Sequence, residues 1–318
     1  MSRNSIPKET TAIDVELAGD VLRVAISGLP EIVSRNAKET LSELRLKHEP
    51  FRNFLNLPPN GNHLINSCLL YPPFEQGADG TLFLASRFAY APYAGTALMA
   101  AATVLAEKQI SAVANGQSLI KLLTADGLMS VELSRTDNAV TQAKWFTAPP
   151  KVLASNAELH LDTGATVPVS LVDAGLPYLV VDVDKMGLSL EDHSSLSEVA
   201  IDLSAASGRQ FPLSRFGSAE TYDNYLVMFS SQVSDNHIKT VWVSDKGEVA
   251  NSAGGTGALS VLAACQGRGT VKSGQPTLIE ASGGAFECQI AGTQATVASE
   301  VKIIAKHEFR LGRHTLSR

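Results

Sequence analysis

Two short segments rich in glycine and threonine are the strongest candidates for chemistry in this chain. They are Ala94-Gly95-Thr96-Ala97 and Gly254-Gly255-Thr256-Gly257, and each stands directly before a run of small apolar residues. A turn of this type that opens a helix leaves backbone N–H groups without acceptors at the positive end of the helix dipole. We therefore predict a carboxylate-binding site at both turns. Its donors would come from Gly95, Thr96, Gly255, Thr256 and Gly257. The alternative is that the glycines only let the turns pack tightly.

The runs that follow the turns predict two buried helices. Residues 96–106 and 256–264 are almost wholly small and apolar, and a helix that is apolar all round is usually buried on every side. Residues 31–55 have the spacing of an amphipathic helix. Short β-branched and aliphatic stretches predict strands at 21–26, 81–85, 178–183, 225–229 and 240–243. These elements predict an α+β fold of two pseudo-symmetric lobes, each a β-sheet wrapped around a central buried helix.

Recurring landmarks indicate that the two lobes arose by duplication. The two glycine-threonine turns are 160 residues apart, and Ala18-Gly19 is 156 residues before Ala174-Gly175. Gly116-Gln117 precedes Gly274-Gln275 by 158 residues. Three landmarks in the same order with a nearly constant offset predict pseudo-equivalent halves, because a period this long is not that of a solenoid.

The expected domain boundaries follow from this duplication. Ala148-Pro149-Pro150 has the composition of a linker. We predict an N-terminal lobe of residues 1–147 plus 300–318 and a C-terminal lobe of residues 148–299. A ligand cleft between them is expected, where small-molecule sites often lie.

Composition excludes several classes of protein. The chain has 318 residues, a net charge of −6, 44% hydrophobic and 18% charged residues, which is typical of a globular protein and argues against nucleic acid as a partner. No apolar run approaches the ~20 residues of a membrane span, and Met1-Ser2-Arg3-Asn4 lacks the apolar stretch expected of a signal peptide. Three scattered cysteines are too few for a disulfide framework or a zinc cluster. We expect a cytoplasmic protein without a metal.

The two turns resemble the active-site motifs of the proline racemase family. Tyr93-Ala94-Gly95-Thr96 is similar to the Met-Cys-Gly-His motif of proline racemases and hydroxyproline epimerases. The segment from Ala250 to Gly257 is similar to their Asp-Arg-Ser-Pro-Cys-Gly-Thr-Gly motif, and Pro58-Pro59-Asn60-Gly61-Asn62 resembles their Glu-Pro-Arg-Gly-His segment. The resemblance runs through nearly the whole chain and implies the diaminopimelate-epimerase-like fold.

The resemblance also implies a cofactor-independent mechanism, but this chain lacks the residues that transfer protons in the family. In the family, one cysteine thiolate removes the Cα proton and the opposite thiol returns one. Those cysteines correspond to Ala94 and Gly254, the family's histidine to Thr96 and its aspartate to Ala250. None of these four side chains transfers a proton at neutral pH. We therefore expect a proline- or hydroxyproline-like carboxylate ligand with altered or no racemase activity. The trans-3-hydroxyproline dehydratase branch differs too, because it keeps one of the two cysteines.

Other residues could replace the missing acid and base. His63 and Asp20 are the candidate substitutes by position, with an ordinary loop histidine as the alternative for His63. Cys68, Cys265 and Cys288 are predicted to be core residues, since a free cysteine behaves as a small buried hydrophobe.

Three functions stay open from the sequence. The chain could be an enzyme, as an amino-acid racemase or epimerase or a one-base lyase, or a non-catalytic carboxylate-binding or regulatory protein. It could also be an isomerase of a neighbouring branch of the same fold, such as the phenazine-biosynthesis type. Sheet-rich lobes of this kind also make a homodimer a candidate assembly.

Overall fold

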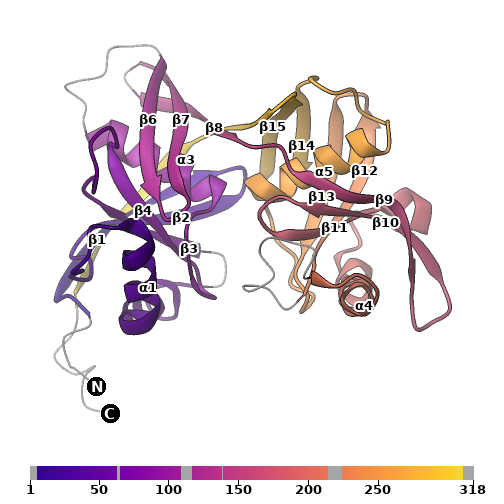
Figure 1. The fold of residues 1–318 in the computed structure, drawn as a ribbon, viewed down its shortest axis with the longest axis horizontal. Coiled ribbons are helices and arrows are strands. Elements are labelled where there is room, and N and C mark those ends of the chain that lie inside the picture. The colour runs from indigo at the N-terminus through magenta and orange to yellow at the C-terminus, as the bar shows by residue number, and fades with distance from the viewer. Residues whose placement is uncertain (1–5, 63–64, 109–116, 138, 214–223, 311–318) are drawn as a thin grey trace. The chain divides into compact units, whose positions relative to one another are not determined.

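The computed structural model describes residues 6–62, 65–108, 117–137, 139–213 and 224–310. The chain divides into two compact units (Figure 1): Met1–Trp145 with Glu300–Arg318, and Phe146–Ser299. Of the predicted features, His63 and Gly116 lie outside the described residues.

The first unit is a sheet that curls around one helix. Its strands are β1 (Glu9–Leu17), β2 (Asp20–Ser27), β3 (Ile65–Tyr71), β4 (Gly80–Ala85), β5 (Tyr90–Ala91), β6 (Gln117–Thr124), β7 (Gly127–Thr136), β8 (Ala139–Thr147) and β17 (Lys302–Arg310). Its helices are α1 (Ala37–Lys47), α2 (Glu49–Asn56) and α3 (Gly95–Lys108). The strands pair in the order β17-β1-β2-β3-β4-β6-β7-β8, and β5 pairs with β4.

The second unit has the same plan. Its strands are β9 (Lys151–His160), β10 (Thr166–Asp173), β11 (Pro177–Asp182), β12 (Leu226–Ser234), β13 (His237–Val243), β14 (Thr277–Ala281), β15 (Gly284–Ala291) and β16 (Gln294–Glu300), paired in chain order. Its helical elements are η1 (Val183–Met186), α4 (His193–Gln210) and α5 (Gly255–Gly267).

The strand pairings confirm the internal duplication. From β17 to β8 the successive pairs are antiparallel, antiparallel, parallel, antiparallel, parallel, antiparallel and antiparallel. From β9 to β16 the sequence of pair types is identical. In each unit the second parallel step follows the small apolar helix, α3 or α5. A parallel pair needs such a crossover, so the helix and the sheet order recur together.

The two small apolar helices are buried as predicted. The residues from Ala97 to Thr103 in α3 are all almost inaccessible to solvent, and so are those from Gly257 to Cys265 in α5. Alanine, glycine and serine are frequent in both helices, which lets the backbone approach the surrounding strands closely. The fold is therefore α+β, with each sheet wrapped around one helix.

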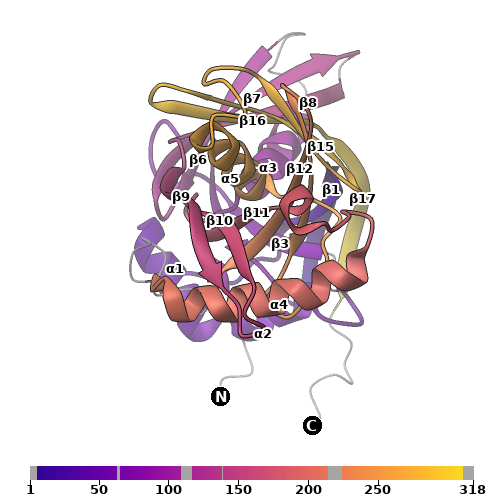
Figure 2. The ribbon, with the colours of Figure 1, turned by 90° about the vertical axis from the view of Figure 1, so that its right-hand side faces the viewer.

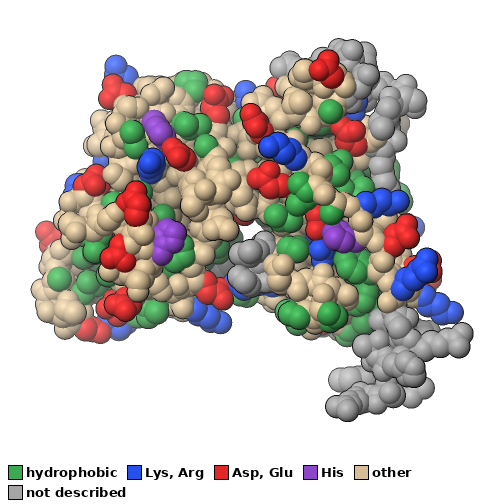
Figure 3. All heavy atoms as spheres, turned by 180° about the vertical axis from the view of Figure 1, so that it is seen from behind, with side chains coloured by type: hydrophobic (Ala, Val, Ile, Leu, Met, Phe, Trp, Pro, Cys, Tyr) green, Lys and Arg blue, Asp and Glu red, His purple; other side chains and the backbone are tan. Residues whose placement is uncertain are grey.

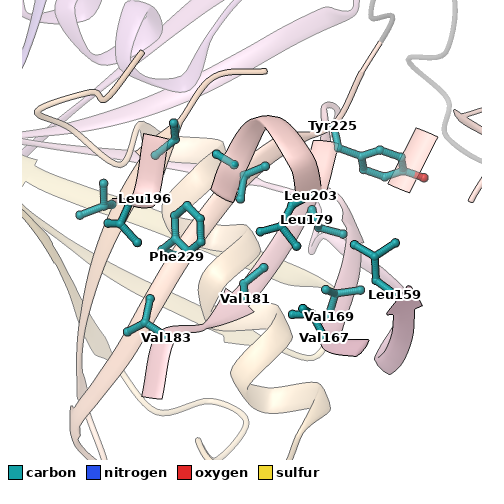
Figure 4. Packing of buried hydrophobic residues seen from close by; sticks show 14 of the residues in the cluster. Leu159, Val167, Val169, Leu179, Val181, Val183, Leu196, Leu203, Tyr225 and Phe229 are labelled. Atoms are coloured by element: carbon teal, nitrogen blue, oxygen red, sulfur yellow. The ribbon is translucent and has the colours of Figure 1, made fainter. Parts of the chain in front are cut away.

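The outer face of each sheet carries a second set of helices. In Figures 1 and 2, α4 and α5 lie on opposite sides of the strands β10–β12. Leu179 and Val181 pack with Leu203 of α4 in one apolar cluster, shown in Figure 4, while Val180 between them points to the other face. In the first unit, α1 and α2 cover the corresponding face through Leu41, Leu44, Phe51 and Leu55.

The single amphipathic helix predicted for residues 31–55 is wrong in one respect, because two helices fill this region. Asn36 begins α1, its Oδ1 accepting from Lys38 N at 3.0 Å and Glu39 N at 3.2 Å. Helix α1 ends at Lys47, and His48 lies between the two helices. Pro50 lies in the first turn of α2. Proline lacks an N–H and clashes with the preceding turn, so α1 cannot continue through it.

Two surface properties bear on partners. No helix in the described parts of the chain is long and apolar enough to cross a membrane. On the face shown in Figure 3, basic and acidic side chains are interspersed within each unit. A broad basic patch, which a nucleic-acid backbone would require, is not seen among the described residues of that face.

Candidate carboxylate-binding site

The first glycine-threonine turn opens α3. Ala94 is the N-cap residue, because its carbonyl accepts the first helical hydrogen bond from Leu98 N at 3.0 Å. The N–H groups of Gly95, Thr96 and Ala97 follow it, and none has an acceptor within the helix. An alanine at the N-cap offers no side-chain oxygen to them. The turn therefore presents a set of backbone donors at the positive end of a buried helix.

Trp145 covers this turn. A Cβ built on Gly95 would lie 2.5 Å from two carbons of the Trp145 ring, so the glycine is required by close packing. Trp145 is almost fully buried, and its ring meets that of Tyr93 edge-on at a centroid distance of 6.0 Å. Burial raises the pKa of the Tyr93 hydroxyl, and Asp126 raises it further, so the phenol next to Ala94 stays neutral.

The second turn opens α5 with the same pattern of backbone bonds. Gly254 is the N-cap residue, its carbonyl accepts from Ala258 N at 2.9 Å, and no described side chain caps the helix. Ser252 Oγ accepts from Gly254 N at 3.1 Å and so holds the approach to the turn. Gly255, Thr256 and Gly257 then supply the donors at the helix start.

The backbone at Gly254 is left-handed, with a φ of +63°. A side chain there would meet no atom within 4 Å, so the space in front of the turn is open. L-residues rarely adopt this φ. A cysteine at position 254 would therefore have room for its side chain but would need a different backbone conformation.

A tyrosine from β11 contacts the second turn. Tyr178 Oη and Thr256 Oγ1 are 2.8 Å apart, although the residues are 78 positions apart in the chain. Tyr178 is buried, and its ring also lies against Gly257, whose added Cβ would be 3.6 Å from Cε1.

Ala250 and Asp20, the other candidates from the sequence, lie on segments near the two turns. Ala250 precedes the second turn and donates its N–H to Trp242 O at 3.0 Å. Asp20 is the first residue of β2, at the sheet edge where β3 begins and β4 ends. The first turn starts from that same edge, because β5, which precedes it, pairs with the end of β4. The neighbouring Glu16 accepts from Gly19 N at 3.0 Å and so closes the β1–β2 turn.

All three cysteines are core residues, as predicted. Cys68 lies in β3, Cys265 near the end of α5 and Cys288 in β15, and all are buried and free. Burial raises the pKa of each thiol, which keeps it protonated and unreactive. Among the described residues, no group of three or more His, Cys, Asp or Glu side chains could hold a metal ion.

Sequence reasoning missed Trp145, Tyr178 and Ser252. Ser252 could have been suspected from its place two residues before Gly254, since serine often binds a nearby backbone N–H. Trp145 and Tyr178 contact the turns from distant strands, and no local pattern marks such contacts.

Comparison with known proteins agrees with this architecture. Two duplicated units, each with a buried helix opened by a glycine-rich turn, define a protein of the proline-racemase-like and diaminopimelate-epimerase-like fold class. A family model described as proline racemase matches residues 12–317. The chain belongs to the proline racemase family.

The relatives include two activities. A 4-hydroxyproline 2-epimerase from Allorhizobium ampelinum is 24% identical over 312 residues, which cover 96% of this chain and 90% of the relative. A trans-3-hydroxy-L-proline dehydratase from Bacillus cereus is 23% identical over 320 residues, covering 97% and 94%.

Solved structures share the fold. The hydroxyproline epimerase from Agrobacterium vitis with bound trans-4-hydroxy-L-proline has a TM-score of 0.79 and 23% identity, covering 96% of this chain and 93% of that one. A putative phenazine-biosynthesis protein from Clostridium difficile is a weaker match, with a TM-score of 0.56, 12% identity and coverage of 95% and 100%. Both likenesses show the fold that this chain shares with them.

Proposed function

We propose that this protein binds the carboxylate of a small proline-like imino acid through backbone N–H groups at its glycine-threonine turns. Membership of the proline racemase family supports a ligand of this class, and trans-4-hydroxy-L-proline is bound in the similar epimerase structure. Both turns begin buried helices without a side-chain cap from Ala94 or Gly254. A carboxylate accepting several backbone N–H bonds at a helix N-terminus is well stabilised.

The proposal includes the absence of the family's two-thiol proton transfer. One observation carries it: Ala94 and Gly254 occupy the N-cap positions of the two turns, while every cysteine of the chain is buried in a core. General acid–base catalysis needs a titratable group within hydrogen-bond reach of the proton. Methyl and hydrogen side chains cannot supply one. The protein would act as a carboxylate-binding member of the family without a cofactor, and buried free thiols suit a reducing cytoplasm.

Calorimetry with trans-4-hydroxy-L-proline tests the binding directly. We expect saturable binding, because a turn at a helix N-terminus offers a fixed set of N–H donors to a carboxylate. Prolinamide, which lacks the carboxylate charge, is expected to bind at least about tenfold more weakly. Equal affinity for the two compounds, or no heat with either, would refute the carboxylate site.

Ala94→Asp separates binding from stability. An aspartate at the N-cap of α3 accepts the turn's N–H groups itself, so we expect the protein to gain about 1 kcal/mol of stability. The aspartate carboxylate also occupies the N–H groups that would bind the ligand, and its negative charge repels the ligand carboxylate. Affinity for hydroxyproline is therefore expected to fall about tenfold or more. Thermal unfolding and calorimetry on the same sample measure both.

Ala94→Asn is the matched control for this prediction. Asparagine caps a helix about as well as aspartate but adds no charge. It should give a similar gain in stability with a smaller loss of affinity. If the aspartate variant kept the affinity of the unaltered protein, the first turn could not be part of the site.

A further inference from the structure

The second turn has a contact between two side-chain hydroxyl groups. Tyr178 Oη lies 2.8 Å from Thr256 Oγ1 at the start of α5. Tyr178 is only 4% exposed, so its hydroxyl is held by the surrounding strands and is not a surface group that happens to reach the turn. Thr256 is partly accessible to solvent. It belongs to the second turn, and the space in front of Gly254, the N-cap residue of that turn, is open.

The first unit has no hydroxyl at the equivalent place. Tyr178 follows Ala174 of its hairpin by four residues, and Leu22 follows Ala18 of the corresponding hairpin by the same number. Both residues lie near the start of equivalent strands, where β11 pairs parallel with β12 and β2 with β3. Leu22 is buried and apolar, so the tyrosine hydroxyl distinguishes the second turn from its pseudo-equivalent.

We propose that Tyr178 is a positioning residue that aims the Thr256 hydroxyl at the ligand carboxylate. A phenol is a stronger acid than an aliphatic alcohol, so Tyr178 is the better donor and Thr256 the acceptor in their hydrogen bond. The proton of Thr256 is then free to point away from Tyr178. At a helix N-terminus, a carboxylate beside the N–H groups is its natural acceptor.

This inference rests on the proposed function, since it assigns a side-chain donor to the carboxylate site. It adds a side-chain hydroxyl to the backbone donors of the second turn. One carboxylate oxygen would receive a hydroxyl donor from the second turn in addition to backbone N–H groups.

A double-mutant cycle tests the coupling. Thr256→Val removes the hydroxyl donor at nearly constant shape, and Tyr178→Phe removes only the oxygen that orients it. Each is expected to weaken binding of trans-4-hydroxy-L-proline about five- to tenfold. Because Tyr178 acts through Thr256, the double variant should bind no more weakly than Thr256→Val alone. Thr256→Ser keeps the hydroxyl and should stay within about twofold of the unaltered protein.

Tyr225→Phe is the matched control for loss of a buried phenol. Tyr225 is buried in the same unit and donates to Phe211 O at 2.7 Å. Its replacement should lower the melting temperature about as much as Tyr178→Phe but leave the dissociation constant unchanged. Independent, multiplying effects of Tyr178→Phe and Thr256→Val on affinity would overturn the positioning role and leave the proposed function standing.

Acetate separates failure of the inference from failure of the proposed function. In ¹⁵N-labelled protein, acetate should shift the backbone amide of Thr256, and Tyr178→Phe should reduce that response. A response to acetate without binding of hydroxyproline would overturn the proposed ligand and retain the role of Tyr178. A response that is equal in the Tyr178→Phe variant would overturn that role, and no response to either compound would overturn both.

Discussion

Asp14→Ala is expected to lower the free energy of unfolding of the first unit by about 3–5 kcal/mol. Asp14 and Arg23 are both nearly inaccessible, and two hydrogen bonds of 2.9 and 3.0 Å join the guanidinium to the two carboxylate oxygens. His307 Nε2 adds a contact of 2.8 Å to Asp14 Oδ2. The substitution leaves a buried guanidinium without its counter-charge, and that desolvation penalty dominates the expected loss.

The network joins parts that are distant in sequence. Asp14, Arg23 and His307 lie on β1, β2 and β17, the last of which comes from the end of the chain. Arg23 also donates to the carbonyls of Leu55 at 3.1 Å and of Asn60. The Asn60 carbonyl belongs to the segment that resembles the family's Glu-Pro-Arg-Gly-His motif, so loss of the network should also loosen that segment.

The tryptophans allow each unit to be followed separately. The chain has two, Trp145 in the first unit and Trp242 in the second. In a Trp242→Phe background, the fluorescence of Trp145 during urea unfolding reports on the first unit alone. Glu9→Ala is the control, because Glu9 pairs with Arg310 at 3.5 Å with both side chains largely exposed, and it should change stability by less than about 0.5 kcal/mol. An Asp14→Ala effect as small as that of Glu9→Ala would show that the buried network contributes little.

Gly95→Ala is expected to weaken hydroxyproline binding about tenfold or more and to destabilise the protein by about 1–3 kcal/mol. The new methyl group would stand 2.5 Å from the Trp145 ring, which is buried and cannot swing into solvent. Either the ring or the first turn of α3 must move. In a displaced turn the backbone N–H groups no longer point together at the ligand carboxylate, so affinity for hydroxyproline falls together with stability. Calorimetry and thermal unfolding measure the two effects.

Two further variants make this prediction specific. Trp145→Leu removes the ring, so Gly95→Ala should cost almost nothing further in that background, which is a non-additive result. Gly208→Ala is the matched glycine control, since its added Cβ would meet only Asn224 Oδ1 at 3.8 Å. Within α4 that change should stabilise by about 0.5–1 kcal/mol. If Gly95→Ala behaved like Gly208→Ala, Trp145 would not constrain the turn.

Sequence patterns predicted the parts of the fold that depend on local composition. The runs of alanine and small apolar residues after both turns indicated α3 and α5, since such a helix can only be buried. The recurrence of Ala18-Gly19 and Ala174-Gly175 located equivalent hairpins before β2 and β11. These features are visible because composition and spacing along the chain express them directly.

Elements and contacts that depend on packing between distant segments could not be predicted from local sequence patterns. Helix α4 has serine and alanine at many positions, so its apolar face, with Leu196, Ala200 and Leu203, gives only a weak periodic signal. Its burial comes from the strand cluster it covers (Figure 4). The same holds for the site: Trp145 reaches Gly95 and Tyr178 reaches Thr256 only through strand pairings set by the whole sheet.

Exchange of the Cα proton in D₂O tests the central claim most directly. The protein is incubated in D₂O with trans-4-hydroxy-L-proline at a concentration that calorimetry shows to be saturating, and the Cα–H signal is followed by NMR. We predict saturable binding with loss of the Cα–H signal no faster than without protein, because Ala94 and Gly254 supply no acid or base at the turns. Deuterium incorporation above that background would contradict the account, since it would require an acid–base pair beside the bound carboxylate.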